Sequence, residues 1–356
     1  MRKLMVTEKG FSLKRTVPFL LLGILVFVVY LYFFVGISEL FAILGSVNLF
    51  YYCIAAAFLF LTMFFNSLAW HYFLCPLSVK VPLRKTFLFT WIGTFVDLLV
   101  PAESISGDAT KLYLMTKESG ESAGKVVASV VSNRIVTMMI TLGSLIFSSA
   151  VLYTINYALP SSVLNLVLLI IVGTVVTLFF LFLCILKERL TTKVIDIAIR
   201  FLVFITRGSW ELDSLRTKAS KALTAFHGSI QLLFKNPKHL VLPVVFAIIS
   251  WLFSIFISYF IFISLGQKAD FVLITIVYSV SVNVQSIPLG IPAEVGVVEI
   301  VMTSLYGLLG VEAGFAAAIT VLIRLLTVWL RIIIGFLTVQ WIDFRELVKN
   351  LRQNLF

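Results

Sequence analysis

The chain has 356 residues, of which 60% are hydrophobic and 13% charged, and its mean hydropathy is +1.08. Soluble globular domains carry about a quarter charged residues, so this composition excludes a soluble protein with one anchor and predicts bilayer hydrocarbon as the main solvent. The net charge of +11 lies in particular loops. This placement favours membrane orientation and contact with anionic lipid headgroups, and no nucleic acid is expected as a partner.

Six apolar stretches are long enough to cross a bilayer, which takes about 20 helical residues. We expect them at 16–36, 49–75, 126–152, 163–186, 240–265 and 315–342. The first is longer than a signal-peptide core and shows no small-residue cleavage site, so it is predicted to be a membrane helix. The predicted fold class is an all-α polytopic membrane protein, with one membrane domain over 1–356.

Two further stretches are apolar but interrupted. One covers 87–101 and runs into FVDLLVPAESISGD, and the other covers 271–310 around QSIPLGIPAEVG. The breaking residues are Pro101 and Gly107 in the first, and Pro288, Pro292 and Gly296 in the second. Proline lacks a backbone donor, and the freed backbone groups are tolerated at membrane depth only inside protein or beside a water-filled cavity. Both stretches are predicted to be re-entrant, broken helix pairs; a short loop followed by an ordinary helix is the alternative.

The distribution of basic residues predicts the orientation. The predicted cytoplasmic segments are all basic: the N-terminal segment, the loop with Lys80, Arg84 and Lys85, the segment 187–239 and the C-terminal tail. The predicted outward loops near 37–48, 153–162 and 266–270 hold Lys268 as their one basic residue. We therefore expect a multi-pass protein of the plasma membrane with both termini in the cytoplasm. Segment 187–239 mixes apolar runs with Lys and Arg, which predicts an amphipathic connector on the cytoplasmic leaflet; a regulatory or lipid-recruiting role is the alternative.

The two breaks resemble each other. Both contain Pro-Ala-Glu, at 101–103 and 292–294, and an arginine follows each glutamate by 31 or 30 residues. In the predicted topology the first hairpin enters from the cytoplasm and the second from outside. These features predict an inverted repeat, with repeat A over 49–152 and repeat B over 240–342, and transporters of this kind bind substrate at the repeat interface.

Charged side chains inside the membrane are costly and normally face a partner or a cavity. The basic ones are Arg134, Arg324, Arg331 and Lys111, and the nearby hairpin carboxylates are Asp97, Glu103, Asp108, Glu294 and Glu299. One interpretation is internal ion pairing that holds the hairpins in place. The other is a site for an anionic group such as phosphate, which the planar guanidinium binds in bidentate fashion. Asn133 and Gln285 are further candidate cavity residues. No metal site and no cofactor are expected, because the spans hold no cluster of His or Cys.

These residues resemble the flippase-like membrane family that also forms the membrane half of lysylphosphatidylglycerol synthases. In the second hairpin, Pro292, Gly296, Glu299 and the later Arg324 match the family pattern, while Ala293 and Glu294 replace its usual glycines. In the first hairpin, Pro101, Gly107, Asp108 and Arg134 match less closely, with Lys111 where arginine is usual and Thr137 where an acid often follows. The aminoacyl-transferring domain follows the membrane part in those synthases and the sequence given ends at Phe356, so the resemblance implies lipid translocation and no enzymatic activity.

The predicted function is that of a flippase or scramblase for a lipid with an anionic headgroup, such as a phospholipid or a polyprenyl-phosphate-linked sugar. Its phosphate is expected on Arg134 and Arg324 in one midplane cavity, with the tail left in the bilayer. Hairpin carboxylates are candidates for coupling or structural roles. The main alternative is an ion-coupled carrier of a small soluble anion, and a more remote one is an intramembrane enzyme that uses Glu294 and Glu299.

Overall fold

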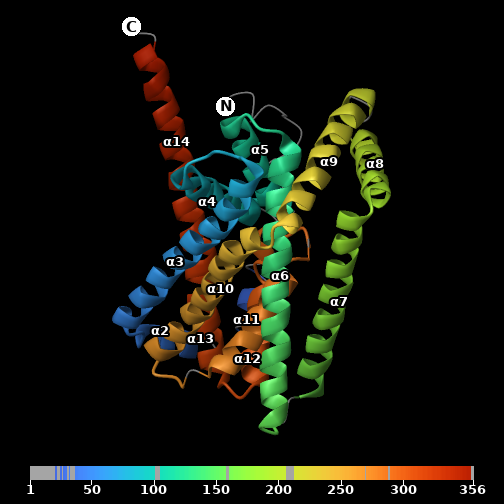
Figure 1. The fold of residues 1–356 in the computed structure, drawn as a ribbon. Helices are drawn as coiled ribbons and strands as arrows, with labels where there is room; N and C mark the ends of the chain where they lie inside the picture. Colours follow the sequence, from blue (N-terminus) through green and yellow to red (C-terminus); the bar gives the residue numbers. More distant parts are fainter. Residues whose placement is uncertain are drawn as a thin grey trace.

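The fold is a bundle of helices, shown as a computed structural model in Figure 1. The structure describes residues 21, 25, 27–29, 32, 37–100, 105–157, 160–205, 212–268, 270–287 and 289–353. Within these residues every regular element is a helix. The chain is therefore an all-α protein, as its composition predicts.

Five helices within the described residues are long and apolar enough to cross a membrane. They are α3 (Leu49–Leu74, extended by the 3-10 turn η1 at Cys75–Leu77), α6 (Ala123–Thr154), α7 (Ser161–Leu186), α10 (Lys238–Ser264), and the run α13–η3–α14 (Ala313–Arg324, Leu325–Leu330 and Arg331–Gln353). They agree with five of the six predicted spans. The first predicted span, 16–36, lies mostly outside the described residues, and those of its residues that are described are helical. The chain is thus a multi-pass membrane protein.

The remaining helices are shorter or more polar. They are α2 (Ile37–Gly45), α4 (Leu83–Leu99), α5 (Ile105–Ser119), α8 (Glu188–Ile205), α9 (Leu212–Lys235), α11 (Phe271–Gln285), the 3-10 turn η2 (Pro292–Glu294) and α12 (Val297–Leu308). Two helices begin at residues whose side chains cap the helix start. The Asp270 side chain accepts the backbone N–H groups of Val272 and Leu273 at the start of α11, and Asn48 accepts that of Phe50 at the start of α3.

Both predicted breaks separate two short helices. In the first, α4 ends at Leu99 and α5 begins at Ile105; in the second, α11 ends at Gln285 and α12 begins at Val297. Three residues named for these breaks, Pro101, Glu103 and Pro288, lie outside the described residues. The re-entrant position of the hairpins stays a prediction.

The two hairpins point in opposite directions along the bundle. At the end of the molecule where α3 begins and α10 ends, the Asn48 N–H donates to the Ser264 carbonyl over 2.7 Å. At that same end in Figure 1, α6 finishes and α12 finishes, and the Tyr157 hydroxyl donates to the Leu309 carbonyl over 2.9 Å. The α11–α12 hairpin therefore opens at this end, whereas the α4–α5 hairpin opens at the other end, where α6 begins.

The hairpins meet where their helices break. Leu98 near the end of α4 clusters with Ala293 and Val295 of the second break, together with Val328. α4 also crosses α14 closely, since a Cβ added at Gly335 would lie 2.4 Å from the Phe95 Cβ. Each hairpin thus reaches the interior of the bundle from its own end.

The connector 187–239 forms two helices, and one of them belongs to the bundle. Leu223, Phe226, Ile230 and Leu233 form a buried face of α9 that joins the core around α3 and η1. A Cβ at Gly124, near the start of α6, would lie 2.1 Å from the Ala222 carbonyl oxygen, so α9 packs directly on α6. This differs from the expectation of a connector that lies only on the membrane surface: the apolar face of α9 is covered by protein.

Candidate functional site

The first hairpin is built on a close crossing of α4 and α5. A Cβ added at Gly107 would lie 2.6 Å from the Gly93 carbonyl oxygen, closer than real Cβ contacts come, so the two backbones touch here. One turn further along α4, the Asp97 carboxylate accepts the Gly107 N–H at 2.9 Å and the Ser106 hydroxyl at 2.8 Å. Asp97 therefore caps the start of α5 and fixes the side chains of its first turn.

Those side chains include a small ion-pair network. Asp108 accepts Lys111 Nζ at 3.1 Å and Arg134 NH1, from the neighbouring α6, at 3.3 Å. The side chains of Lys111, Asp108 and Arg134 are 19%, 25% and 36% exposed. The Lys111 ammonium also lies 6.0 Å from the centre of the Trp70 ring of α3, within reach of a cation–π contact. The sequence analysis named each of these three charged residues as a candidate, and the structure brings them together.

All three line a cavity of about 1000 Å³. Its polar wall is formed by α3, α4, α5 and α6, with the side chains of Asn66, Trp70, Thr90, Asp97, Asp108, Lys111, Asn133 and Arg134. α7 contributes Leu166, Leu169, Ile170, Gly173, Thr174, Thr177 and Leu181, most of which are apolar. The end of α11 closes one side through Asn283 and its neighbours, and Asn283 accepts the Thr174 hydroxyl at 2.9 Å. The charged residues that line the cavity therefore all come from α4, α5 and α6, and α7 contributes none.

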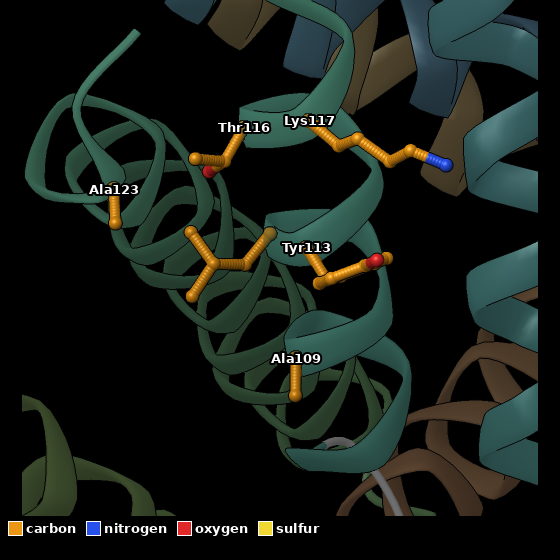
Figure 2. A pocket seen from close by; sticks show the side chains of 6 residues that line it. Ala109, Tyr113, Thr116, Lys117 and Ala123 are labelled. Atoms are coloured by element: carbon orange, nitrogen blue, oxygen red, sulfur yellow. The ribbon is translucent and has the colours of Figure 1, made fainter. Parts of the chain in front are cut away.

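A smaller pocket of about 360 Å³ lies between α5 and the start of α6 (Figure 2). It shares Ala109 and Leu112 with the large cavity. Figure 2 shows Ala109, Tyr113 and Thr116 on successive turns of α5, with Lys117 next to Thr116 and Ala123 at the start of α6. Lys117 is its one charged side chain, so it lacks the combination of cations and carboxylates found in the large cavity.

The second hairpin holds a buried counterpart of the ion pair. Glu299, in the first turn of α12, accepts Arg324 Nε at 2.6 Å through one carboxylate oxygen and the Gly296 N–H at 2.7 Å through the other. The Arg324 NH2 group donates to the Ala293 carbonyl at 2.5 Å. Arg324 and Glu299 are 4% and 5% exposed. Arg324 thus ties the turn of the hairpin to α13.

The turn of the second hairpin has a backbone conformation that favours glycine. Ala293 and Glu294, which stand where the family usually has glycine, adopt φ values of 50° and 44°, and Gly296 adopts 94°. Positive φ is costly for residues with a Cβ, so glycine is the natural occupant. The Glu294 side chain is 1% exposed, and its Oε2 has no hydrogen-bond partner among the described residues.

The structure separates residues that were expected in one site. Arg324 is buried against Glu299 and does not line the cavity that holds Arg134, so in this conformation the two arginines do not share a pocket. Arg331 lies beyond the π-helical segment η3 and its Nε has no hydrogen-bond partner among the described residues. Asn133 lines the cavity as expected, but Gln285 does not, and Asn283 occupies the corresponding place on α11.

Sequence reasoning missed three contributors to the site. Gly93, Trp70 and Thr174 lie within helices whose composition is otherwise apolar, and nothing in their spacing marks them. Their roles depend on which helices cross and how closely. Asp97 was recognised only as an acidic residue near the break, and its capping of α5 follows from the fold of the hairpin.

These features define the class: a polytopic membrane protein with two opposed, broken-helix hairpins, each carrying a carboxylate–arginine pair. The family described as the lysylphosphatidylglycerol synthase transmembrane region matches residues 20–335. The chain therefore belongs to this family.

Three archaeal proteins, each named a UPF0104 membrane protein, are similar over most of their length. That of Pyrococcus horikoshii is 26% identical, over 76% of this chain and 80% of the relative. That of Methanothermobacter thermautotrophicus is 25% identical, over 83% and 86%. That of Methanocaldococcus jannaschii is 24% identical, over 89% and 92%. Their names state a location in the membrane and no activity.

Proposed function

We propose that the protein moves a lipid with a phosphate-containing headgroup between the two leaflets of the plasma membrane, without enzymatic activity. The observation that carries this proposal is the mixed lining of the large cavity. Arg134 and Lys111 line it together with the apolar residues Leu166, Leu169 and Ile170 of α7. A lipid likewise combines a charged head with an apolar tail.

The ion pair in the cavity is suited to exchange. The side chains of Asp108 and Arg134 are 25% and 36% exposed. Pairs that contact solvent are worth about 0–1 kcal/mol, so a phosphate that offers several acceptor oxygens to Arg134 and Lys111 replaces the carboxylate at little cost. The first turn of α5 also lies at the cavity, and the start of a helix favours anions.

The orientation follows from the basic residues. Lys80, Arg84 and Lys85 lie beside the start of α4, and the Arg84 guanidinium stacks on Trp341 of α14 at 5.1 Å from the ring centre. The ends of α5, α8 and α14 and the start of α9 lie at this same end of the molecule (Figure 1). By the positive-inside rule this end is cytoplasmic and contacts anionic headgroups. Under the proposal the chain therefore has both termini in the cytoplasm, since the N-terminal segment and the C-terminal tail are both basic. The α4–α5 hairpin opens at this end, so the cavity it lines faces the cytoplasmic leaflet.

The test is lipid translocation in phosphatidylcholine vesicles that contain the purified protein and a trace of fluorescent phosphatidylglycerol. A membrane-impermeant reductant bleaches the probe in the outer leaflet, so translocation appears as bleaching beyond that leaflet. We expect bleaching beyond that of protein-free vesicles, and a loss of about tenfold or more in rate for Arg134→Ala, as for an interaction worth about 1.4 kcal/mol. The matched control is Lys125→Ala, which removes a cation paired with Glu121 outside the cavity.

The alternative functions predict other results. An ion-coupled carrier of a small anion takes up labelled inorganic phosphate into the vesicles and leaves the fluorescent lipid in place. An enzyme changes the lipid itself, which mass spectrometry of the extracted lipids detects. Equal lipid bleaching with and without the protein overturns the proposal, and unchanged bleaching with Arg134→Ala overturns the assignment of the site.

A further inference from the structure

The two ion pairs occupy equivalent places in the two hairpins. Asp108 and Glu299 each lie in the first turn of the second hairpin helix, α5 or α12. Each pairs with an arginine of the following helix, 26 residues later at Arg134 and 25 residues later at Arg324. In each hairpin a carboxylate also accepts a glycine N–H beside that turn: Asp97 from Gly107 and Glu299 from Gly296. This structural correspondence supports the internal repeat more strongly than the shared Pro-Ala-Glu sequence does.

The pairs differ in access. The Asp108–Arg134 pair lines the large cavity, whereas the side chains of Glu299 and Arg324 are 6% and 4% exposed. The residues next to the pairs differ in the same way. One helical turn from Asp108 and Arg134, on the side of the hairpin opening, lie Leu112 and Val130, and both line the cavity. The interface between α5 and α6 is therefore open.

The equivalent interface between α12 and α13 is closed but polar. One turn from Glu299 and Arg324, again on the side of the hairpin opening, lie Thr303 and Thr320. They are 3% and 0% exposed, and neither hydroxyl oxygen has a hydrogen-bond partner among the described residues. Buried polar groups are nearly always paired, so two unpaired hydroxyls beside a buried ion pair need an explanation. An alternative state in which water or a ligand reaches them supplies one.

The helix that carries Arg324 is irregular directly after this arginine, where a change from the closed to an open interface would need to occur. Immediately after Arg324 the helix continues as the π-helical segment η3, Leu325–Leu330, before α14 resumes α geometry. The corresponding helix next to the first hairpin, α6, is α-helical throughout Ala123–Thr154. π-helical turns inside helices are frequent at functional sites, because their altered hydrogen-bond ladder allows a local shift.

We propose that Glu299 and Arg324 form a second site for a phosphate-bearing group, closed in this conformation and reached between α12 and α13 past Thr303 and Thr320. Because the hairpins are opposed, this path leads to the side of the membrane opposite to the large cavity. When the α12–α13 path opens, the α5–α6 path closes, and the group passes from one arginine to the other. The identity of the group rests on the proposed function; the existence of the path does not.

The test is thiol accessibility. Cys53, Cys75 and Cys184 are first replaced by serine. Single cysteines are then placed at Thr303 or Thr320 on the proposed path, and at Leu112 as the reference for the open cavity. A membrane-impermeant maleimide is applied to intact cells and, separately, to inverted membrane vesicles. We expect Thr303→Cys and Thr320→Cys to react from the side opposite to that which labels Leu112→Cys.

The matched controls are Leu305→Cys on α12 and Ala318→Cys on α13, which are as buried, at 3% and 0%, but point away from the pair around their helices. We expect both path positions to react at least about tenfold faster than these controls, which corresponds to about 1.4 kcal/mol in the free energy of opening. Labelling at the control rate, or from the same side as Leu112→Cys, overturns the path. These readouts need no transport, so a protein that labels as expected but moves no lipid refutes the proposed function alone.

The nature of the bound group is tested by protection in reconstituted vesicles. Labelling of Thr320→Cys is compared in phosphatidylcholine vesicles, in vesicles enriched in phosphatidylglycerol, and in phosphatidylcholine vesicles with added inorganic phosphate. Slower labelling with phosphatidylglycerol alone is expected for a lipid headgroup. Slower labelling with inorganic phosphate instead overturns the lipid as the source, and no protection in either case overturns the second site as a binding site.

Discussion

At the scale of single residues, the glycines at the crossing of α4 and α5 set the geometry of the cavity. A Cβ at Gly107 would lie 2.6 Å from the Gly93 carbonyl and 2.7 Å from the Asp97 carboxyl carbon. The methyl group of Gly107→Ala must push the helices apart, which we expect to cost about 1–3 kcal/mol of stability. The measurement is thermal unfolding in detergent. The control is Gly143→Ala in α6, where a Cβ meets nothing within 4 Å, and an unchanged or slightly higher midpoint is expected. Equal midpoints for both variants contradict the prediction.

The two arginines differ in what they leave behind when removed. Arg324→Met strands the Glu299 carboxylate, which is 5% exposed, and breaking a buried pair in this way costs about 3–5 kcal/mol. Arg134→Met leaves Asp108 with Lys111 and part of its surface in solvent, so we expect a loss of no more than about 1 kcal/mol. The midpoints of thermal unfolding of the two variants in detergent measure this difference.

A second substitution serves as the control for the buried pair. Glu299→Gln keeps an acceptor for the Gly296 N–H while removing the stranded charge. In the Arg324→Met background it is therefore expected to recover part of the lost stability, and the double-mutant cycle gives the coupling between the two side chains. Equal losses of stability for Arg324→Met and Arg134→Met contradict the prediction that the buried ion pair is the more costly one to break.

At the scale of elements, the turn η2 is strained where the family usually has glycine. Ala293 has φ 50°, and the left-handed region costs a residue with a Cβ about 1–2 kcal/mol. Ala293→Gly is therefore expected to raise the unfolding midpoint, although glycine loses more backbone entropy on folding. The opposite sign is expected for Ala317→Gly inside α13, where the same change costs about 1 kcal/mol of helix propensity. A lower midpoint for Ala293→Gly shows that the turn is not strained there.

The elements also show how far the sequence determines the fold. Five spans were predicted to within a few residues, because a run of about 20 apolar residues has few alternatives in a bilayer. The breaks were found because proline and glycine act locally. The sequence left the partner of Arg134 open among the hairpin carboxylates Asp97, Glu103 and Asp108. The pairing with Asp108 depends on how α5 lies against α6, which is set by the Gly93–Gly107 contact between α4 and α5.

The packing of α9 was beyond sequence reasoning for a related reason. Its apolar face suits a membrane surface and a protein core equally well. The absence of a side chain at Gly124 lets α9 approach α6, and that signal becomes meaningful only once the two helices are known to be neighbours. Likewise, the separation of Arg324 from the cavity follows from the closure of α12 on α13, which the sequence of either helix does not specify.

At the scale of the whole molecule, α7 is the helix with the least protein around it among the five described spans. α7 also lines the cavity, largely with apolar residues, so under the proposed function we expect the lipid tail to lie along this helix. A ligand with its headgroup on Arg134 then keeps its tail in contact with the apolar residues of α7 and with the surrounding bilayer. No energy is spent on moving the tail into water, and the polar headgroup alone requires a protected path.

This route predicts that an obstacle on α7 stops transport without affecting the fold. Gly173 lines the cavity, and a Cβ there meets nothing within 4 Å, so the Gly173→Trp side chain leaves the helix without a backbone clash and adds a large ring at the cavity. We expect the translocation of fluorescent phosphatidylglycerol to fall by about tenfold or more, equivalent to about 1.4 kcal/mol, with the unfolding midpoint unchanged. The matched control is Gly143→Trp on α6, which is equally open but lies outside the cavity, and its transport is expected to equal that of the unaltered protein. If Gly173→Trp transports lipid at the rate of Gly143→Trp, the tail does not pass along α7, and the headgroup must move by a path that leaves this wall of the cavity free.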